Sequence, residues 1–410
     1  MKNVARTPTI VALVGSVLGL IFSGYSTSDY MQHLDRQLHA VHCSFIPGMP
    51  AAAEADSGCR AAMYSAYSAF FRETWWGGIP ISLWALAVYA FYTAFAVALL
   101  VGGLRASRRA YMFFGITSVF PVVMSVIMAV ISAVKLGSFC KTCIGMYIAS
   151  ILLVAGGVWA WLAIRKLQRV APADGWPEGY LPDAKPAWIG LWLIGMGISV
   201  LLPTLIYVTA LPDYRPRLAS CGKLPEPADT NKALLKLATA HPKRPATLFV
   251  DPLCPTCKSL HQRLEAEGVI DNLDLSVALF PLDNTCNWMI DRALHAGSCV
   301  LARAVLCADP RSREALDWMY SNQEELTRLG KSGEPLLRAR VRERFGAELD
   351  ACIDAKSTKL RLNNILQYSV NNHIPVSTPQ MYLGDQRICD EDTDLGMRFT
   401  LGQLAPEVLR

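Results

Sequence analysis

Charged residues are scarce in this sequence of 410 residues. They make up only 18 % of the chain, whereas soluble domains carry about 25 %. The shortage falls mainly in the first half, and the mean hydropathy of the whole chain is positive. The net charge of +5 is too small to indicate a nucleic-acid partner. Low-complexity segments are also lacking. The composition therefore excludes an ordinary soluble chain and a nucleic-acid-binding protein, and it indicates a lipid bilayer as a partner.

Long apolar runs are what the first half has instead. A bilayer core needs about 17–25 residues of helix, and five runs are near that length: Thr9–Tyr25, Ile79–Val101, Tyr111–Val134, Phe139–Ile164 and Trp188–Ala210. The first run is short and follows Lys2 and Arg6, so a cleaved signal peptide is the alternative. No clear small-x-small cleavage site follows it, which favours a retained helix. Pro121 is expected to kink the third span.

Basic residues predict the orientation of these spans. Loops on the cytoplasmic side carry the excess of Lys and Arg, and alternating spans place all of the following on one side: Lys2, Arg6, Arg105, Arg108, Arg109, Arg165, Lys166, Arg169 and Lys185. The segment 26–78, the turn Lys135–Ser138 and everything after residue 210 then face the opposite compartment. Every cysteine lies on or near that outer side.

The second half of the chain has the pattern of an α/β domain. Three apolar segments read as strands, Ala246–Val250, Leu273–Leu279 and Gln380–Leu383, and a mostly helical stretch is expected over Asn287–Asn371. A strand, a Cys-x-x-Cys pair, a helix, a strand, a helical insertion and a final strand after a proline form a thioredoxin-like order.

The predicted protein therefore has several domains. We expect an all-α transmembrane four-helix bundle over residues 1–165. A cytoplasmic loop, a fifth linking membrane helix and a Pro-rich linker follow over 166–227. The α/β thioredoxin-like domain with its helical insertion occupies 228–410.

Twelve cysteines are present, and four of them lie in two Cys-x-x-Cys pairs. Such usage is typical of a redox protein that faces an oxidising compartment. In the soluble domain, Cys254 precedes a predicted helix, whose N-terminus favours a thiolate, so Cys254 is expected to attack and Cys257 to resolve. A zinc half-site and structural cysteines are the alternatives, but zinc would need a second close cysteine pair, which the domain lacks, and we expect no metal. Thr378-Pro379, before the last strand, is expected to be a cis-proline loop facing this disulfide.

The membrane half carries two further cysteine pairs. Cys140 and Cys143 have helical spacing at the outer end of the fourth span, where the alternative role is apolar packing. Tyr147 lies on the same helix face, where its phenol would hydrogen-bond a quinone carbonyl or pack in the interfacial belt. Cys43 and Cys59 lie in the outer loop, which suits either a mobile shuttle or a structural disulfide.

These features together resemble the bacterial vitamin K epoxide reductase family, in the form fused to a thioredoxin-like domain. The residues that carry the resemblance are Cys43 and Cys59, the segment Gly78–Trp84 entering the second span, the Cys140/Cys143 pair, Ser65 six residues after Cys59, and Tyr147 four residues after Cys143. With the fifth span, linker and soluble domain, the resemblance covers nearly the whole chain. The chain departs from the family in the sixteen-residue separation of its loop cysteines and in an insertion at Phe70–Trp76. Its soluble domain is closer to the periplasmic oxidase and isomerase branch than to a minimal thioredoxin.

The resemblance implies an enzyme that passes electrons along its cysteines. Reduced exported proteins would reduce Cys254–Cys257, which would reduce Cys43–Cys59, which would reduce Cys140–Cys143. Cys143 would deliver the electrons to a quinone, ubiquinone or menaquinone, held near Ser65 and Tyr147. The implied location is the bacterial inner membrane, with a cytoplasmic N-terminus and a periplasmic thioredoxin-like domain.

Six cysteines remain, and the sequence does not choose among their many pairings. The set that we expect is Cys286–Cys299, Cys307–Cys352 and Cys221–Cys389, as structural disulfides. Two other functions stay open at this point. One is a membrane-anchored disulfide isomerase or reductase, and the other is a non-catalytic cysteine-rich membrane module.

Overall fold

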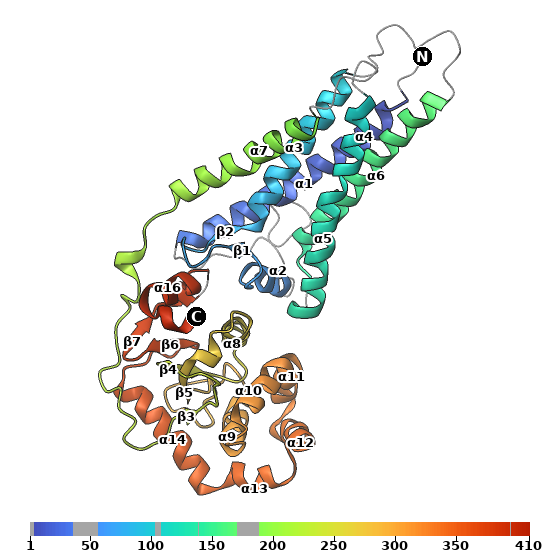
Figure 1. Cartoon of the computed structure of the whole chain (residues 1–410). Helices are drawn as coiled ribbons and strands as arrows, with labels where there is room; N and C mark the ends of the chain where they lie inside the picture. Colours follow the sequence, from blue (N-terminus) through green and yellow to red (C-terminus); the bar gives the residue numbers. More distant parts are fainter. Residues whose placement is uncertain (1–3, 36–55, 103–107, 138, 170–187, 394) are drawn as a thin grey trace, which may run out of the picture. The chain divides into compact units, whose positions relative to one another are not determined.

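The computed structural model describes residues 4–35, 56–102, 108–137, 139–169, 188–393 and 395–410 (Figure 1). The chain forms two compact units that divide after Pro212, and each is described by itself. This division lies earlier than the expected domain start at residue 228, because the linker is bound to the second unit. Ala219 donates its backbone N–H to the Asp392 carboxylate at 3.0 Å, and Cys221 forms a disulfide with Cys389.

The first unit is helical. Its described elements are α1 (Arg6–Gln32), α2 (Asp56–Met63), α3 (Ile81–Gly102), α4 (Arg108–Thr117), α5 (Val119–Ile131), α6 (Lys141–Arg169), α7 (Trp188–Ala210) and a two-stranded antiparallel sheet of β1 (Ala69–Phe70) and β2 (Ile79–Pro80). Five stretches have the length and hydropathy to cross a bilayer: Arg6–Gln32, Ile81–Gly102, Arg109–Leu136, Lys141–Lys166 and Gly190–Ala210. They coincide with the five predicted spans, so the chain is a multi-pass membrane protein.

Helix α1 extends seven residues beyond the predicted end at Tyr25. The extra turns are largely polar, and the Thr27 hydroxyl is satisfied within the helix, since it donates to the carbonyl of Ser23 at 2.8 Å. Ser23 makes the same bond to Gly19 at 2.6 Å. Such back-bonding lets a Ser/Thr-rich segment remain helical.

Helix α1 packs between α6 and α3, while α4 packs on α6 and α7 on α3 (Figure 1). The contact of α1 with α6 depends on glycines from both helices. A Cβ at Gly156 would lie 2.3 Å from the backbone nitrogen of Ala12, and a Cβ at Gly15 would lie 2.5 Å from that of Leu153. Small residues allow membrane helices to approach this closely. The tight fit favours α1 as a retained part of the bundle.

The Gly156→Ala variant is expected to destabilise the first unit by about 1–3 kcal/mol, the usual cost of overpacking. Its methyl group meets backbone, which cannot move aside as a flexible side chain would. Gly197→Ala on α7 is the matched control, because nothing lies within 4 Å of its Cβ position. Thermal unfolding in detergent measures both variants. Equal melting temperatures would show that the α1–α6 contact is looser than the structure has it.

The third span is broken where proline was expected to kink it. Helix α4 ends at Thr117 and α5 begins at Val119, because Pro121 has no N–H to give to the carbonyl four residues earlier. The hydroxyl of Tyr92 on α3 donates to that Thr117 carbonyl at 2.6 Å. A neighbouring helix thus satisfies the freed backbone group, as the bilayer core requires.

The second unit contains a five-stranded sheet in the order β3-β5-β4-β6-β7. The strands are β3 (Leu235–Lys236), β4 (Arg244–Val250), β5 (Leu273–Leu279), β6 (Gln380–Leu383) and β7 (Gln386–Ile388). Strands β4 and β5 are parallel and joined by α8 (Pro255–Ala266), whereas β6 lies antiparallel to β4 and to β7. A parallel β-α-β unit beside an antiparallel hairpin is the thioredoxin-like arrangement, so the predicted fold class is confirmed.

Further helices surround this sheet, and most form the insertion between β5 and β6 (Figure 1). They are α9 (Ser298–Cys307), α10 (Ser312–Ser321), α11 (Gln323–Ser332), α12 (Glu334–Phe345), α13 (Glu348–Asp354), α14 (Lys356–Asn371), α15 (Asp390–Thr393) and α16 (Met397–Leu404). Strands β5 and β6 have the predicted bounds. The core of the unit is apolar, with Leu235, Phe249, Leu275 and Ile365 fully buried.

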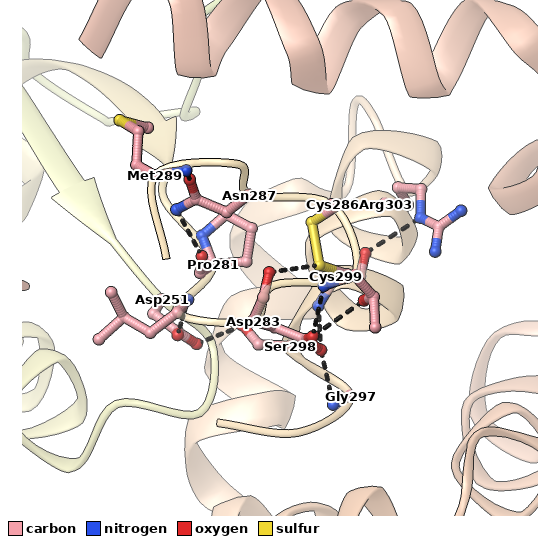
Figure 2. The surroundings of a disulfide bond; sticks show 12 residues. Asp251, Pro281, Asp283, Cys286, Asn287, Met289, Gly297, Ser298, Cys299 and Arg303 are labelled. Carbon is pink, nitrogen blue, oxygen red and sulfur yellow. Dashed lines mark hydrogen bonds between the residues drawn. A yellow bond between two sulfur atoms is a disulfide. The ribbon is translucent and has the colours of Figure 1, made fainter. Parts of the chain in front are cut away.

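The helical insertion begins at Ser298, so its expected start at Asn287 is wrong. Figure 2 shows the reason: polar side chains and a disulfide hold the preceding segment as a loop. The Asp283 carboxylate accepts the backbone N–H of Gly297 at 2.8 Å, and the side chain of Asn287 donates to the Pro281 carbonyl at 2.9 Å. These groups satisfy the backbone at separations that a helix would not allow.

Candidate active site

The soluble cysteine pair lies at the junction of β4 and α8. Cys254 is the N-cap residue of α8 and Pro255 occupies its first turn, where a missing N–H costs nothing. Cys254 and Cys257 are both free thiols. Position at the N-terminus of a helix favours the thiolate form of the first sulfur.

Hydrogen bonds and burial give the two thiols different pKa values. A hydrogen bond with the Cys257 thiol is the main cause that lowers the pKa of Cys254 to about 6. Burial opposes this effect, and hydrogen bonds with Thr256 and Thr378 add to it. Burial, together with the neighbouring Cys254, raises the pKa of Cys257 well above its ordinary value. At neutral pH the first sulfur is therefore a thiolate able to attack, and the second is a protonated thiol. This is the division that thiol–disulfide exchange needs.

The cis-proline loop faces Cys254. The Thr378–Pro379 peptide bond is cis, and the Thr378 carbonyl lies 3.4 Å from the Cys254 sulfur. Thr256, which the sequence analysis did not single out, places its hydroxyl 2.9 Å from the same sulfur and 3.1 Å from the Thr378 carbonyl. The structure thus brings together the four soluble-domain residues predicted for the site and adds a threonine.

A buried carboxylate supports the loop before the motif. Asp251 is fully buried and accepts hydrogen bonds from the backbone N–H groups of Leu253 and Leu282, both at 2.7 Å. Ser298, labelled with Asp251 in Figure 2, donates at 2.5 Å, and the His295 ring lies at 2.8 Å. Burial alone would lower the pKa of His295, but Asp251 raises it above its ordinary value.

The membrane cysteines lie close to a cysteine of helix α2. Cys140 precedes α6 and Cys143 lies in its first turn, and both are free thiols. The Sγ atom of Cys59, on α2, lies 3.1 Å from that of Cys140. Cys59 is disulfide-bonded, whereas Cys43 lies outside the described residues. A thiol this close to a disulfide sulfur is placed for exchange.

An apolar cavity of about 500 Å³ opens beside these sulfurs within the helices of the first unit. Cys59, Cys140, Cys143, Ser65 and Tyr147 all contribute to its wall. Most of its other lining residues are apolar or aromatic, from α1, α3, α5, α6 and α7. The structure therefore places the described residues predicted for the membrane site around one space.

The insertion before the second span supports Ser65, a role that the sequence analysis missed. Arg72 is buried, with only 4 % of its surface exposed. Its guanidinium donates to the Ser65 carbonyl and to the Ser68 hydroxyl, the latter at 2.7 Å. Phe70 from the same insertion stacks on Trp84 of α3, with ring centroids 5.0 Å apart. The insertion thus contacts and holds in place residues that line the cavity, Ser65, Ser68 and Trp84.

The remaining cysteines form three disulfides in the second unit, in the expected pairs Cys221–Cys389, Cys286–Cys299 and Cys307–Cys352. Among the described residues, His261, Glu265 and Asp317 do place potential ligand atoms within 4.8 Å of one another.

Comparison with known proteins gives one family. Residues 10–156 match the model of the vitamin K epoxide reductase family. The sequence has no significant match among curated proteins. Among solved structures, the chain is similar to the oxidoreductase DsbA from Xylella fastidiosa, with 19 % sequence identity and a TM-score of 0.32 over 45 % of this chain and 93 % of that one.

Proposed function

Because residues 10–156 match the model of the vitamin K epoxide reductase family, we propose that this oxidoreductase is a quinone-dependent thiol oxidase that forms disulfide bonds in exported proteins. The observation that carries the proposal is the 3.1 Å separation of the Cys59 and Cys140 sulfurs at the wall of a cavity of about 500 Å³. The proposed location is the bacterial inner membrane, with the N-terminus cytoplasmic and the thioredoxin-like domain periplasmic.

The first reaction takes place in the soluble domain. A substrate thiolate attacks Cys254 of the oxidised Cys254–Cys257 pair, and Cys257 leaves as a thiolate that takes up a proton. A second substrate thiol then attacks the mixed disulfide, so that a substrate disulfide forms and Cys254 is released as a thiolate. The low pKa of Cys254, about 6, makes it a good leaving group. That property favours oxidation of substrates over the isomerase or reductase alternative.

The outer cysteines then carry the electrons to the membrane pair. The Cys254 thiolate attacks the Cys43–Cys59 disulfide, and closure of Cys254–Cys257 releases the loop dithiol. The Cys59 thiolate attacks Cys140, the Cys140–Cys143 bond breaks, and Cys143 leaves with the electron pair. Attack of Cys43 on Cys59 frees Cys140. A bonded Cys59 beside the free thiols of Cys140 and Cys143 corresponds to the state after this step.

The cavity fits a quinone headgroup in size and in chemistry. Sites for small molecules are mostly apolar, with volumes of about 300–1,000 Å³ and a few polar groups that fix orientation. Here Ser65 and Tyr147, each with a hydroxyl group, line the cavity together with Cys143. We propose that these two residues hold the quinone carbonyls. The quinone supplies an acceptor for two electrons and two protons, which the protein itself lacks.

The proposal is tested by anaerobic mixing of the purified chain with a reduced, unfolded protein substrate and a water-soluble quinone. Quinone absorbance and substrate thiols are followed together. We expect one quinone reduced for each disulfide formed, and no reaction when either partner is omitted. Substrate oxidation without loss of quinone absorbance would contradict the proposed acceptor.

The Tyr147→Phe variant is expected to raise the KM for quinone about fivefold, since a hydrogen bond of a phenol to a bound ligand is worth about 1 kcal/mol. Exchange between Cys59 and Cys140 should stay at the wild-type rate. Tyr111→Phe is the matched control, because that hydroxyl donates to the Leu99 carbonyl inside the bundle. A KM unchanged in Tyr147→Phe would remove the phenol from the quinone site.

A further inference from the structure

A second, much smaller cavity lies inside the thioredoxin-like domain, behind the resolving cysteine. Cys257, His261 and Tyr320 line it together with apolar side chains of the core. Its volume is about 10 Å³, the space that one water molecule requires. It lies between α8, which carries Cys257 and His261, and α10, which carries Tyr320.

The hydroxyl of Tyr320 is an unusual group in this place. Tyr320 is 2 % exposed, and its hydroxyl has no hydrogen-bond partner among the described residues. An unpaired buried hydroxyl costs about 1–3 kcal/mol, so a native structure that keeps one needs a reason for it. The adjacent cavity provides room for a partner that is not part of the chain.

The resolving cysteine has a chemical need that this hydroxyl would meet. Cys257 must lose a proton before it attacks Cys254 and must regain one after it leaves, yet it is 1 % exposed. The nearby Asp251 carboxylate already accepts from Leu253, Leu282 and Ser298 and lies against His295. The Asp251 backbone N–H donates to the Cys257 sulfur at 3.5 Å, so Asp251 presents a donor to this sulfur through its backbone.

We propose that Tyr320 and His261, joined to Cys257 by one water molecule in this cavity, carry protons between the resolving thiol and solvent. The inference rests on the proposed thiol exchange at Cys254–Cys257, but it does not depend on the quinone. In the closing step, the Cys257 proton passes to the water, and the Tyr320 hydroxyl and the His261 ring relay a proton onward. The Cys257 thiolate attacks Cys254, the new disulfide forms, and the departing thiolate takes the electron pair.

The outer end of this path reaches acidic side chains at the surface. The ring of His261 lies 5.1 Å from that of Tyr320, centroid to centroid, and its Nε2 atom is 2.5 Å from Asp317 on α10. Asp317 is 39 % exposed and Glu265, 3.7 Å from the same nitrogen, is 38 % exposed. A proton that reaches His261 therefore has an acceptor in contact with water.

Several charged groups lie around this path, and their charges affect how proton transfer along it depends on pH. Cys254 and Asp251 lie near Cys257 and Tyr320, and Asp317 adds a further negative charge from α10. Arg313 pairs with Glu265 at 3.5 Å. Burial, with Cys257 as the largest neighbouring charge, raises the pKa of Tyr320 well above its ordinary value, so the hydroxyl relays a proton without becoming ionised.

The test isolates the closing step in the full chain. Serine replaces Cys43, Cys59, Cys140 and Cys143, so that only Cys254 and Cys257 react. The reduced protein is mixed with glutathione disulfide, quenched with acid at intervals, and analysed by mass spectrometry for the mixed disulfide and for the closed disulfide. We expect Tyr320→Phe and His261→Gln to close at least about tenfold more slowly at pH 6–7, since positioned acid–base groups contribute about 10²–10⁴-fold. The difference should shrink as the pH rises toward the raised pKa of Cys257, because a growing fraction of this thiol is then already ionised before it attacks.

Tyr368→Phe is the matched control, because its hydroxyl donates to the Pro227 carbonyl at 3.1 Å and does not line this cavity. It should close at the wild-type rate, and formation of the mixed disulfide should be unchanged in all three variants. Wild-type closure in both Tyr320→Phe and His261→Gln would overturn the inference, and so would a loss that is the same at every pH. Because glutathione replaces the quinone chain, failure here leaves the proposed function to its own experiment.

Discussion

The Cys143→Ala variant is expected to lose quinone reduction entirely, even with dithiothreitol as the electron donor. Cys143 is the second thiol of the membrane pair and lines the cavity proposed for the quinone. Without it, Cys140 cannot close an internal disulfide. The Cys140 thiol, with its sulfur 3.1 Å from that of Cys59, should instead attack the disulfide at Cys59 and remain bonded to it. The variant should therefore accumulate a Cys59–Cys140 bond.

Two measurements check this outcome. Quinone absorbance under anaerobic conditions gives the rate, and peptide mapping without reducing agent identifies the Cys59–Cys140 link. Cys254→Ala is the comparison, because it should block the oxidation of protein thiols while dithiothreitol still drives quinone reduction. Substantial quinone reduction by Cys143→Ala would show that the electrons leave the protein from another sulfur.

Residue spacing was sufficient to predict the main elements of both units. The five apolar runs have few charges. In lipid a single segment satisfies all of its backbone hydrogen bonds only as a helix, so such runs are predicted as helices. Strands β5 and β6 are short buried runs next to turn or proline residues, and their bounds matched the expectation. The start of the insertion was missed because hydrogen bonds of Asp283 and Asn287, which join residues several positions apart, decide the loop.

A threonine beside each Cys-x-x-Cys motif could have been recognised from the sequence as part of the site. Both Cys-x-x-Cys pairs have a threonine directly before the second cysteine, Thr142 in one and Thr256 in the other. In each case the hydroxyl lies 2.9 Å from the sulfur of the first cysteine. The repetition of one polar residue at one position was a readable signal. Arg72 and Tyr320 gave no such signal, because their roles depend on contacts made only in the folded chain.

The Thr256→Val variant is expected to raise the pKa of Cys254 from about 6 by about 1–2 units, since a hydrogen bond to a charged group is worth about 1.5–3 kcal/mol. When Cys254 is protonated, the Thr256 hydroxyl has the Thr378 carbonyl as its acceptor at 3.1 Å. The same hydroxyl lies 2.9 Å from the Cys254 sulfur, so it is placed to donate to the thiolate when Cys254 ionises. Valine keeps the shape of the side chain and removes this bond.

The low pKa of Cys254 also makes the stability of the reduced domain depend on pH. A thiol with a pKa of about 6 when folded and about 8.5 when unfolded adds stability that is complete above about pH 8.5. That stability declines as the pH falls and is lost below about pH 6. In Thr256→Val the stabilisation should begin at a higher pH and reach a smaller maximum, while the Cys254–Cys257 disulfide should become a weaker oxidant, because its reduced form loses thiolate stabilisation.

Thiolate absorbance near 240 nm against pH measures the pKa, and equilibration with glutathione measures the oxidising strength, both in the chain whose other four reactive cysteines are serine. Ser259→Ala is the matched control, because its hydroxyl donates to the Pro255 carbonyl at 3.1 Å, one turn along the same helix. An unchanged pKa in Thr256→Val would assign the low value to Cys257 and the helix N-terminus alone. The threonine shared by both cysteine pairs would then have a packing role, and the reactivity of each first sulfur would come from its place before a helix.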